Sequence, residues 1–93
     1  DLACRFGGEE FVVIMPETSA QDAMMIAERL RTSIGDSPFV IGLARDRLEV
    51  TCSVGVAIAA AHEQDADIVL KRADEALYVA KRNGRNKVVA QAA

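Results

Sequence analysis

Two adjacent glycines run directly into two adjacent carboxylates near the start of the chain. Gly7 and Gly8 are followed by Glu9 and Glu10, within the string RFGGEEF at residues 5–11. Adjacent glycines permit positive φ angles and let another molecule approach the backbone closely. Two acids at the tip of a turn repel each other, so a cation or a reacting group is a natural partner for them. A solvated turn whose acids point at water is the alternative.

Two basic residues near the other end of the chain are further candidates. Lys81 and Arg85 bracket the end of an expected helix. The helix dipole alone favours cations at this place. As phosphate ligands, the two cations would face the same substrate as a magnesium-holding acid. Glu9 and Glu10 point to opposite faces if the chain is extended there, so one is expected to hold a metal while the other has a different role.

Other kinds of site have little support. His62 is a lone loop histidine that we expect to be exposed, and no base is placed to activate a serine or threonine. A nucleophilic triad, a Walker-type loop and a cysteine or histidine metal cluster are therefore not predicted. These candidate residues indicate a metal-dependent nucleotide site. They form only one part of it, because two-metal phosphoryl chemistry needs a second carboxylate that the chain does not obviously supply.

The glycine–glutamate string is expected at the tip of a β-hairpin, with strands over Ala3–Phe6 and Phe11–Met15 and Pro16 ending the second strand. Thr18 or Ser19 can then cap a helix whose first turn contains Asp22. Apolar residues at helical spacing predict its buried face, namely Ala20, Ala23, Ala27, Leu30 and Ile34. Gly35 and Pro38 are expected to end this helix.

The second half predicts a short strand at Phe39–Leu43, a polar turn at residues 45–47 and a long strand at Leu48–Ile58 with period-two alternation. The small residues on the second face of the long strand leave room for a ligand or for a closely packed neighbour. Asp65 is expected to cap a second helix that ends at Asn83-Gly84. Its predicted apolar face consists of Ala66, Val69, Leu70, Ala73, Ala76, Leu77 and Ala80, and a last strand is expected at Lys87–Val89.

The predicted order β-β-α-β-β-α-β indicates an α/β (α+β) fold with helices on a largely antiparallel sheet. The 93 residues are enough for one small domain or part of one. The net charge of −3 weighs against a nucleic-acid or anionic-membrane partner, and no apolar run approaches membrane-spanning length. Cys4 and Cys52 lack metal-ligand spacing and are expected to be reduced thiols, which suits the cytoplasm. Because strand-like sequence begins at once, without an initiator methionine, we expect the chain to be cut from a longer protein.

RFGGEEF resembles the signature loop of the GGDEF domain, the diguanylate cyclase module, in its GGEEF form. Three further stretches agree with the family in order and spacing. VTCSVGV at residues 50–56 is similar to its central strand, KRADEALYVAK at residues 71–81 to its last helix, and NGRN at residues 83–86 to the turn that follows. The resemblance covers essentially the whole chain and is closest to the C-terminal end of PleD-type response regulators.

The resemblance implies a nucleotidyl-cyclase-like fold and a bacterial signalling activity, the condensation of two GTP molecules into cyclic di-GMP with release of pyrophosphate. Two domains would meet as an antiparallel homodimer, each presenting one GTP. Gly7 and Gly8 match the backbone against which the nucleotide lies, Glu9 the acid that binds magnesium or manganese, and Glu10 the second signature acid. Lys81 and Arg85 match the ligands of the terminal phosphates.

A product-inhibition site is also implied. Asp1 stands where the family has the aspartate of an Arg-x-x-Asp motif, and Arg29 matches a secondary arginine that contacts cyclic di-GMP; an ordinary exposed helix arginine fits Arg29 equally well. The family's first metal-binding aspartate and its guanine-recognising residues would precede Asp1. Residues 1–93 are therefore expected to be the C-terminal part of a catalytic domain and inactive alone. The alternative is a regulatory module that binds GTP or cyclic di-GMP without turnover.

Overall fold

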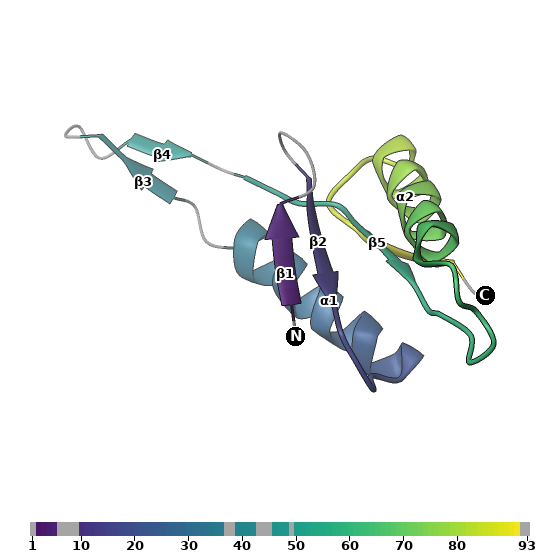
Figure 1. Ribbon diagram of the computed structural model, residues 1–93. Helices are drawn as coiled ribbons and strands as arrows, with labels where there is room; N and C mark the ends of the chain where they lie inside the picture. The colour runs from purple at the N-terminus through teal and green to yellow at the C-terminus, as the bar shows by residue number, and fades with distance from the viewer. Residues whose placement is uncertain (1, 6–9, 37–38, 43–45, 49, 92–93) are drawn as a thin grey trace.

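The computed structural model describes residues 2–5, 10–36, 39–42, 46–48 and 50–91 (Figure 1). Its elements follow the order β-β-α-β-β-β-α-β. The mixed α/β class agrees with the sequence, but the structure has one strand more than the predicted order. Two helices lie on opposite sides of a small pair of strands, and two hairpins extend from this unit.

The first hairpin pairs β1 (Leu2–Arg5) with β2 (Phe11–Ile14). The two strands are antiparallel, with Leu2 opposite Ile14 and Arg5 opposite Phe11. This pairing confirms the predicted hairpin, and the strand ends before Pro16 as expected. The strands before and after the glycine–glutamate string are thus paired as predicted, and residues 6–9 themselves lie outside the described residues.

Helix α1 (Ala20–Gly35) begins at the second of the two predicted caps. The Ser19 hydroxyl accepts a hydrogen bond of 3.1 Å from the backbone N–H of Asp22. Such a contact satisfies one of the free donors at the helix start. On the predicted apolar face, Ala23 and Ala27 are buried, whereas Leu30 is 45% exposed. The face was predicted correctly, but no described part of the chain covers its full length.

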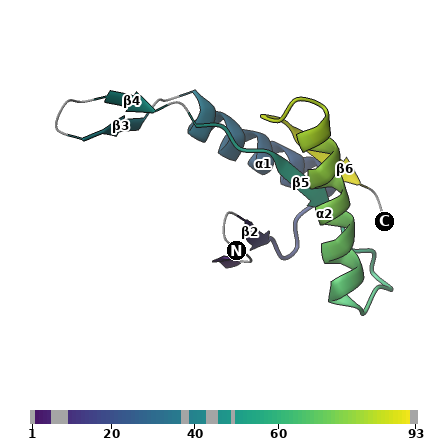
Figure 2. The same cartoon turned by 90° about the horizontal axis from the view of Figure 1, so that it is seen from above.

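The second hairpin pairs β3 (Phe39–Ile41) with β4 (Asp46–Leu48) in antiparallel register. It projects beyond the end of α1, away from the rest of the molecule (Figures 1 and 2). The prediction of a polar turn over residues 45–47 was wrong at its end, because Asp46 and Arg47 belong to β4. These two charged residue types suggested a turn, but edge strands also tolerate charged residues.

The predicted long strand is also shorter in the structure. Only Val54–Ala57 form β5, and residues 50–53 are not in a ladder. A strand needs a partner as well as a pattern, and the partner strand begins only at Val88. The period-two alternation correctly grouped Val54, Val56 and Ile58, which pack together in the core, but it did not predict where pairing begins.

Helix α2 (Ala66–Arg82) has the predicted start and end. The Asp65 carboxylate accepts a hydrogen bond of 2.9 Å from the backbone N–H of Asp67. Asn83 caps the other end, and Gly84 follows with φ of 109°, a value that glycine adopts without strain. Of the predicted apolar face, Ala76 and Ala80 are fully buried.

The last strand, β6 (Val88–Gln91), pairs with β5 in parallel. This overturns the prediction of a largely antiparallel sheet. The described strands form two antiparallel hairpins and one parallel pair instead of a single sheet. Parallel neighbours need a long crossover, and α2 supplies it, so β5, α2 and β6 form a βαβ unit. The strand–helix–strand order in the sequence was the available signal.

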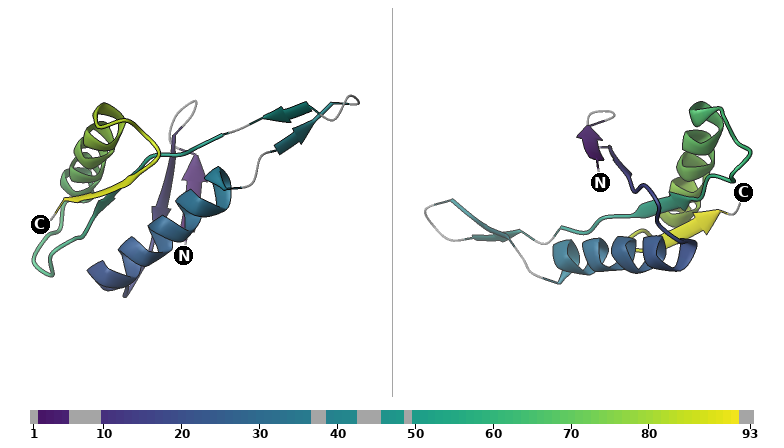
Figure 3. Two further views of the ribbon diagram at one scale, coloured as in Figure 1. Left: turned by 180° about the vertical axis from the view of Figure 1, so that it is seen from behind. Right: turned by 60° about the horizontal axis from the view of Figure 1, so that its bottom comes forward.

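The β5–β6 pair lies between α1 and α2 (Figure 3). Gly55 makes the approach to α2 possible: a Cβ atom there would lie 2.9 Å from Leu77 Cα and would overlap the Ala73 carbonyl oxygen. Of the two uses predicted for the small residues of this strand, close packing is thus the one observed. The core remains small, because its buried members are alanines and Val56.

An ion pair ties the segment after β5 to α2. Arg72 donates to both carboxylate oxygens of Glu63, at 2.6 and 2.7 Å, and to the carbonyl of Ile58 at 2.7 Å. Glu63 also accepts from the backbone N–H of Ala60. The hydrogen bond from Arg72 and that from Ala60 lower the pKa of Glu63 from 4.5 to about 2. Both side chains are only 14% exposed, so the pair fixes this loop on the helix.

Candidate functional site

The carboxylate of Glu10 stands at the end of the first hairpin. Glu10 immediately precedes β2, and its side chain is 43% exposed. The β1–β2 pairing closes at Arg5 and Phe11, so the ladder holds the backbone next to Glu10 in place. Glu10, one of the two predicted signature acids, is thereby held next to a paired strand and remains accessible to a ligand.

Lys81 is brought to the same place by the last turn of α2. Its neighbours on the helix, Ala76 and Ala80, are fully buried, which fixes the rotation of the helix about its axis. The Lys81 ammonium lies 3.9 Å from a carboxylate oxygen of Glu10. Thus the structure joins a predicted acid and a predicted phosphate ligand that are far apart in the sequence.

The ion pair between Glu10 and Lys81 shows where the two side chains lie, but it contributes little to the stability of the fold. Partly exposed ion pairs stabilise a fold by only about 0–1 kcal/mol. At 3.9 Å the contact is long, and an ammonium carries three donors. The Lys81 ammonium can therefore donate to an incoming anion, and the Glu10 carboxylate keeps lone pairs for a cation or a hydroxyl.

Arg85 lies in the turn that follows α2. Its backbone N–H donates to the carbonyl of Ala80 at 2.9 Å, the long-range bond of a Schellman motif. Its φ angle is 64°, and that of the next residue, Asn86, is 49°. The Arg85 side chain is exposed and borders the same groove as Glu10 and Lys81. Glu10, Lys81 and Arg85, the three described residues of the predicted catalytic and phosphate-binding set, thus border one groove.

The turn is also held by residues that the sequence did not point to. The backbone N–H of Asn86 donates to the Ser53 hydroxyl at 3.1 Å. Nη1 of Arg31, on α1, donates to the side-chain oxygen of Asn86 at 2.9 Å. Arg31 and Asn86 are 55 positions apart, so no local spacing could reveal the contact. The only local sign was the NGRN turn itself.

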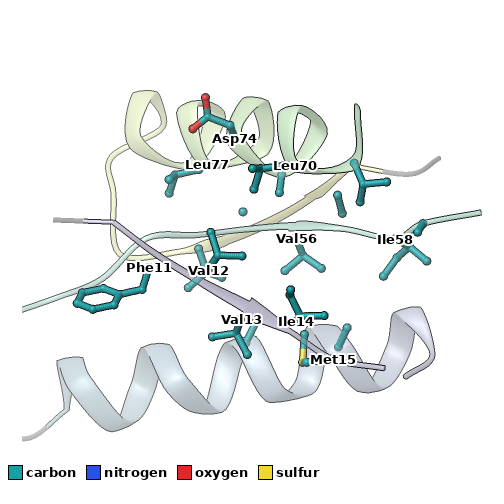
Figure 4. Close-up of a pocket in the computed structure, with 18 of the residues that line it drawn as sticks. Phe11, Val12, Val13, Ile14, Met15, Val56, Ile58, Leu70, Asp74 and Leu77 are labelled. Carbon is teal, nitrogen blue, oxygen red and sulfur yellow. The ribbon is translucent and has the colours of Figure 1, made fainter. Parts of the chain in front are cut away.

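The groove beside the site has a volume of about 1590 Å³. Strands β2 and β5 cross it between the two helices (Figure 4). Its apolar lining includes Phe11, Val13 and Ile14 of β2 and Leu77 of α2. Phe11 is 69% exposed and Ile14 is 51% exposed. The polar residues of the site lie along a groove that is otherwise largely apolar.

Several predicted site residues lie outside the described residues, namely Asp1, Gly7, Gly8 and Glu9. Arg29 is exposed on α1, as both interpretations of it require. Within the described ranges, no three histidine, cysteine, aspartate or glutamate side chains gather as a metal site would need. His62 is exposed, as predicted.

The remaining predictions concern thiols and membranes. Cys52 is a free, half-buried thiol, and burial raises its pKa. Neither α1 nor α2 is long and apolar enough to cross a bilayer.

A family model described as "Diguanylate cyclase, GGDEF domain" matches residues 1–87. The chain belongs to the GGDEF family. The match includes the GGEE string, Glu10 and Lys81, and it confirms the resemblance seen in the sequence motifs. The ion pair between Glu10 and Lys81 therefore joins two motifs of a GGDEF domain.

Curated relatives agree with this assignment. The chain is 53% identical over 93 residues to the response regulator PleD of Caulobacter vibrioides, covering all of this chain and 20% of that protein. It is 42% identical over 88 residues to diguanylate cyclase A of Treponema denticola, covering 95% of this chain and 23% of that protein. The GGDEF chain thus spans about a fifth of the length of these relatives.

Solved GGDEF structures share the fold. The GGDEF domain of DgcB from Caulobacter crescentus, in complex with c-di-GMP, superposes with a TM-score of 0.88 at 35% identity. The active GGEEF domain of a diguanylate cyclase from Vibrio cholerae gives 0.79 at 32% identity. Each match covers 95% of this chain, but 50% and 54% of the solved chains.

Proposed function

We propose that residues 1–93 are the C-terminal part of a diguanylate cyclase domain that condenses two GTP molecules into cyclic di-GMP. The observation that carries this proposal is the approach of Lys81 to Glu10 within 3.9 Å, in a chain of the GGDEF family. An acid for the reacting end of a nucleotide and a cation for its phosphates meet at one place. We take the domain to be cytoplasmic, since GTP is its substrate.

In this proposal, the two cations bind the terminal phosphates of GTP. When the ribose hydroxyl of one GTP attacks the α-phosphorus of the other, the bond to pyrophosphate breaks and negative charge grows on the leaving group. Lys81 and Arg85 stabilise that charge by direct hydrogen bonds. Both side chains border the groove and are reachable from solvent, as phosphate ligands must be.

The acids act at the reacting end. Gly7 and Gly8 let the nucleotide lie against the backbone, while Glu10 assists at the hydroxyl that loses its proton. The chemistry of the donor set fits a divalent ion, because magnesium is commonly bound by one or two carboxylates together with substrate phosphates. Glu9 would hold magnesium or manganese, which supplies positive charge at the reacting phosphate when bound.

Each domain presents one GTP, so the reaction needs two copies in an antiparallel homodimer. The product is also the proposed inhibitor, with Arg29 and Asp1 contacting cyclic di-GMP. Arg29 is exposed on α1 and is therefore accessible to such a ligand. The residues that would recognise guanine are not among the candidates in residues 1–93, so the isolated chain is expected to be inactive.

The test is to incubate the whole protein with GTP and magnesium and to measure pyrophosphate release together with cyclic di-GMP by chromatography. We expect both products in the wild type and neither in Glu9→Ala. If Glu9→Ala retains near-normal turnover, Glu9 does not hold the metal. Calorimetry that shows GTP binding without pyrophosphate release would support the alternative, a regulatory module that binds nucleotide without turnover.

A further inference from the structure

The turn that carries Arg85 has an unfavourable backbone conformation. Arg85 and Asn86 are consecutive and both have positive φ, 64° and 49°. Side chains with a Cβ atom rarely adopt this region, although asparagine tolerates it better than most. Such residues persist when the surrounding structure holds them, and they concentrate at functional sites. The contacts of this turn therefore bear on the position of the Arg85 side chain.

Two contacts from outside the turn hold it, and both are made by Asn86. Its backbone N–H donates to Ser53 Oγ at 3.1 Å, just before β5. Its side-chain oxygen accepts from Nη1 of Arg31 at 2.9 Å. The same nitrogen lies 3.5 Å from the Asn86 carbonyl oxygen. Arg31 thus links α1 to the residue that follows Arg85.

Arg31 also contacts Glu28, one turn earlier on the same helix. Its Nε donates to Glu28 at 2.7 Å, and its Nη2 forms an ion pair with the same carboxylate oxygen. The Arg31 side chain is 20% exposed, compared with 50% for Glu28. A guanidinium that is occupied by Glu28 on one side and by Asn86 on the other is suited to positioning a neighbour. It is poorly suited to binding a phosphate directly.

We propose that Arg31 is a positioning residue, which holds Asn86 and thereby aims Arg85 at the terminal phosphates of the nucleotide. This inference rests on the proposed function, since it needs Arg85 to be a phosphate ligand. In this proposal α1 contributes no phosphate ligand of its own. It contributes Arg31, which controls the position of a phosphate ligand on another element.

The experiment measures KM and kcat for GTP in the whole protein. Arg31→Ala removes the contact from α1, and Asn86→Gly removes it from the turn while keeping a backbone that adopts positive φ freely. Each variant should raise KM about three- to tenfold, the effect of one lost hydrogen bond, with kcat changed less than KM. In an Arg85→Ala background, neither substitution should raise KM further, because the group being positioned is absent.

Glu28→Gln is the matched control, because the glutamine side-chain oxygen can still accept the hydrogen bonds from Arg31 while the charge is removed; the Asn86 contact stays in place, and KM should stay near that of the wild type. If Arg31→Ala fails to fold, Asn86→Gly alone decides the question. An unchanged KM in Asn86→Gly, or an equal rise with and without Arg85, would overturn the inference. If the wild type neither binds nor converts GTP, the proposed function fails first and this inference falls with it.

Discussion

Lys81 and Glu10 meet because the start of β2 lies next to the end of α2. Glu10 immediately precedes β2, and Lys81 lies in the last turn of α2. Each residue type was predicted as a candidate from its motif, and the distance of 3.9 Å between the two side chains adds the geometry. The sequence could not predict this distance, because it depends on how the hairpin and the helix are placed relative to each other.

Among the described residues, a carboxylate with a large shift in pKa lies outside this site. Glu63 has its pKa lowered from 4.5 to about 2, chiefly by the hydrogen bond from Arg72. A carboxylate whose pKa is lower in the folded state stabilises the fold above the unfolded pKa. Its contribution is complete above about pH 4.5 and is lost as the pH falls toward 2.

We therefore expect the melting temperature of the wild type to fall steeply between pH 5 and pH 2, and that of Glu63→Gln to fall less in this range. Thermal denaturation followed by circular dichroism measures both. Asp74→Asn, which changes an exposed carboxylate on α2, is the control and should follow the wild-type profile. Identical profiles for the wild type and Glu63→Gln would show that the Arg72 contact does not stabilise the fold.

Among the elements, the parallel β5–β6 pair packs directly against α2. Gly55 permits this packing because α2 leaves no room for a side chain beneath it. A Cβ atom would lie 2.9 Å from Leu77 Cα, closer than real Cβ atoms approach such a neighbour. Leu77 Cα and the nearby Ala73 carbonyl oxygen are backbone atoms of a helix, so they cannot move aside as a flexible side chain would.

Gly55→Ala should therefore lower the free energy of unfolding by about 1–3 kcal/mol, the usual cost of overpacking. Urea denaturation of the domain measures this loss. Gly35→Ala at the end of α1 is the matched control, because a Cβ atom there would lie 3.6 Å from its nearest neighbour, an ordinary contact. Equal stability of the two variants would mean that β5 and α2 pack less closely than in the structure.

What the sequence predicted at this scale was local. Asp65 was predicted as a helix cap and Ser19 as one of two candidates, because capping needs only a side chain and an N–H two or three residues away. The hairpin around residues 6–10 followed from its glycines and flanking apolar runs. The parallel pairing of β5 and β6 was missed although the strand–helix–strand order indicated it. The contact of Arg31 with Asn86 was missed because the two residues are far apart in the sequence and no local spacing links them.

On the scale of the whole molecule, the described chain leaves much apolar surface uncovered. Its radius of gyration is 14.7 Å, whereas a compact domain of this length has about 12 Å. The groove between the helices has a volume of about 1590 Å³, larger than the roughly 300–1,000 Å³ of most small-molecule sites. Apolar side chains that line this groove, such as Phe11, Ile14 and Leu30, are exposed.

We expect the isolated 93-residue chain to self-associate or to exchange elements between copies, because exposed apolar patches and free strand edges favour association. Analytical ultracentrifugation should show species larger than a monomer. Phe11→Glu, within the groove, should reduce the association. Met25→Glu, an exposed residue of α1 that does not border the groove, should leave it unchanged. A monomeric chain that unfolds cooperatively would contradict the expectation.

If Lys81 and Arg85 bind the terminal phosphates of GTP, the rate of cyclic di-GMP formation depends on them, and the decisive measurement is kcat/KM for this reaction in the whole protein. The control is Arg82, the adjacent basic residue, whose guanidinium lies 5.7 Å from the centre of the Tyr78 ring and which does not border the groove. We predict that Lys81→Ala lowers kcat/KM by about 10²-fold or more, while Arg82→Ala stays near the wild type. Equal activity of the two variants would contradict it.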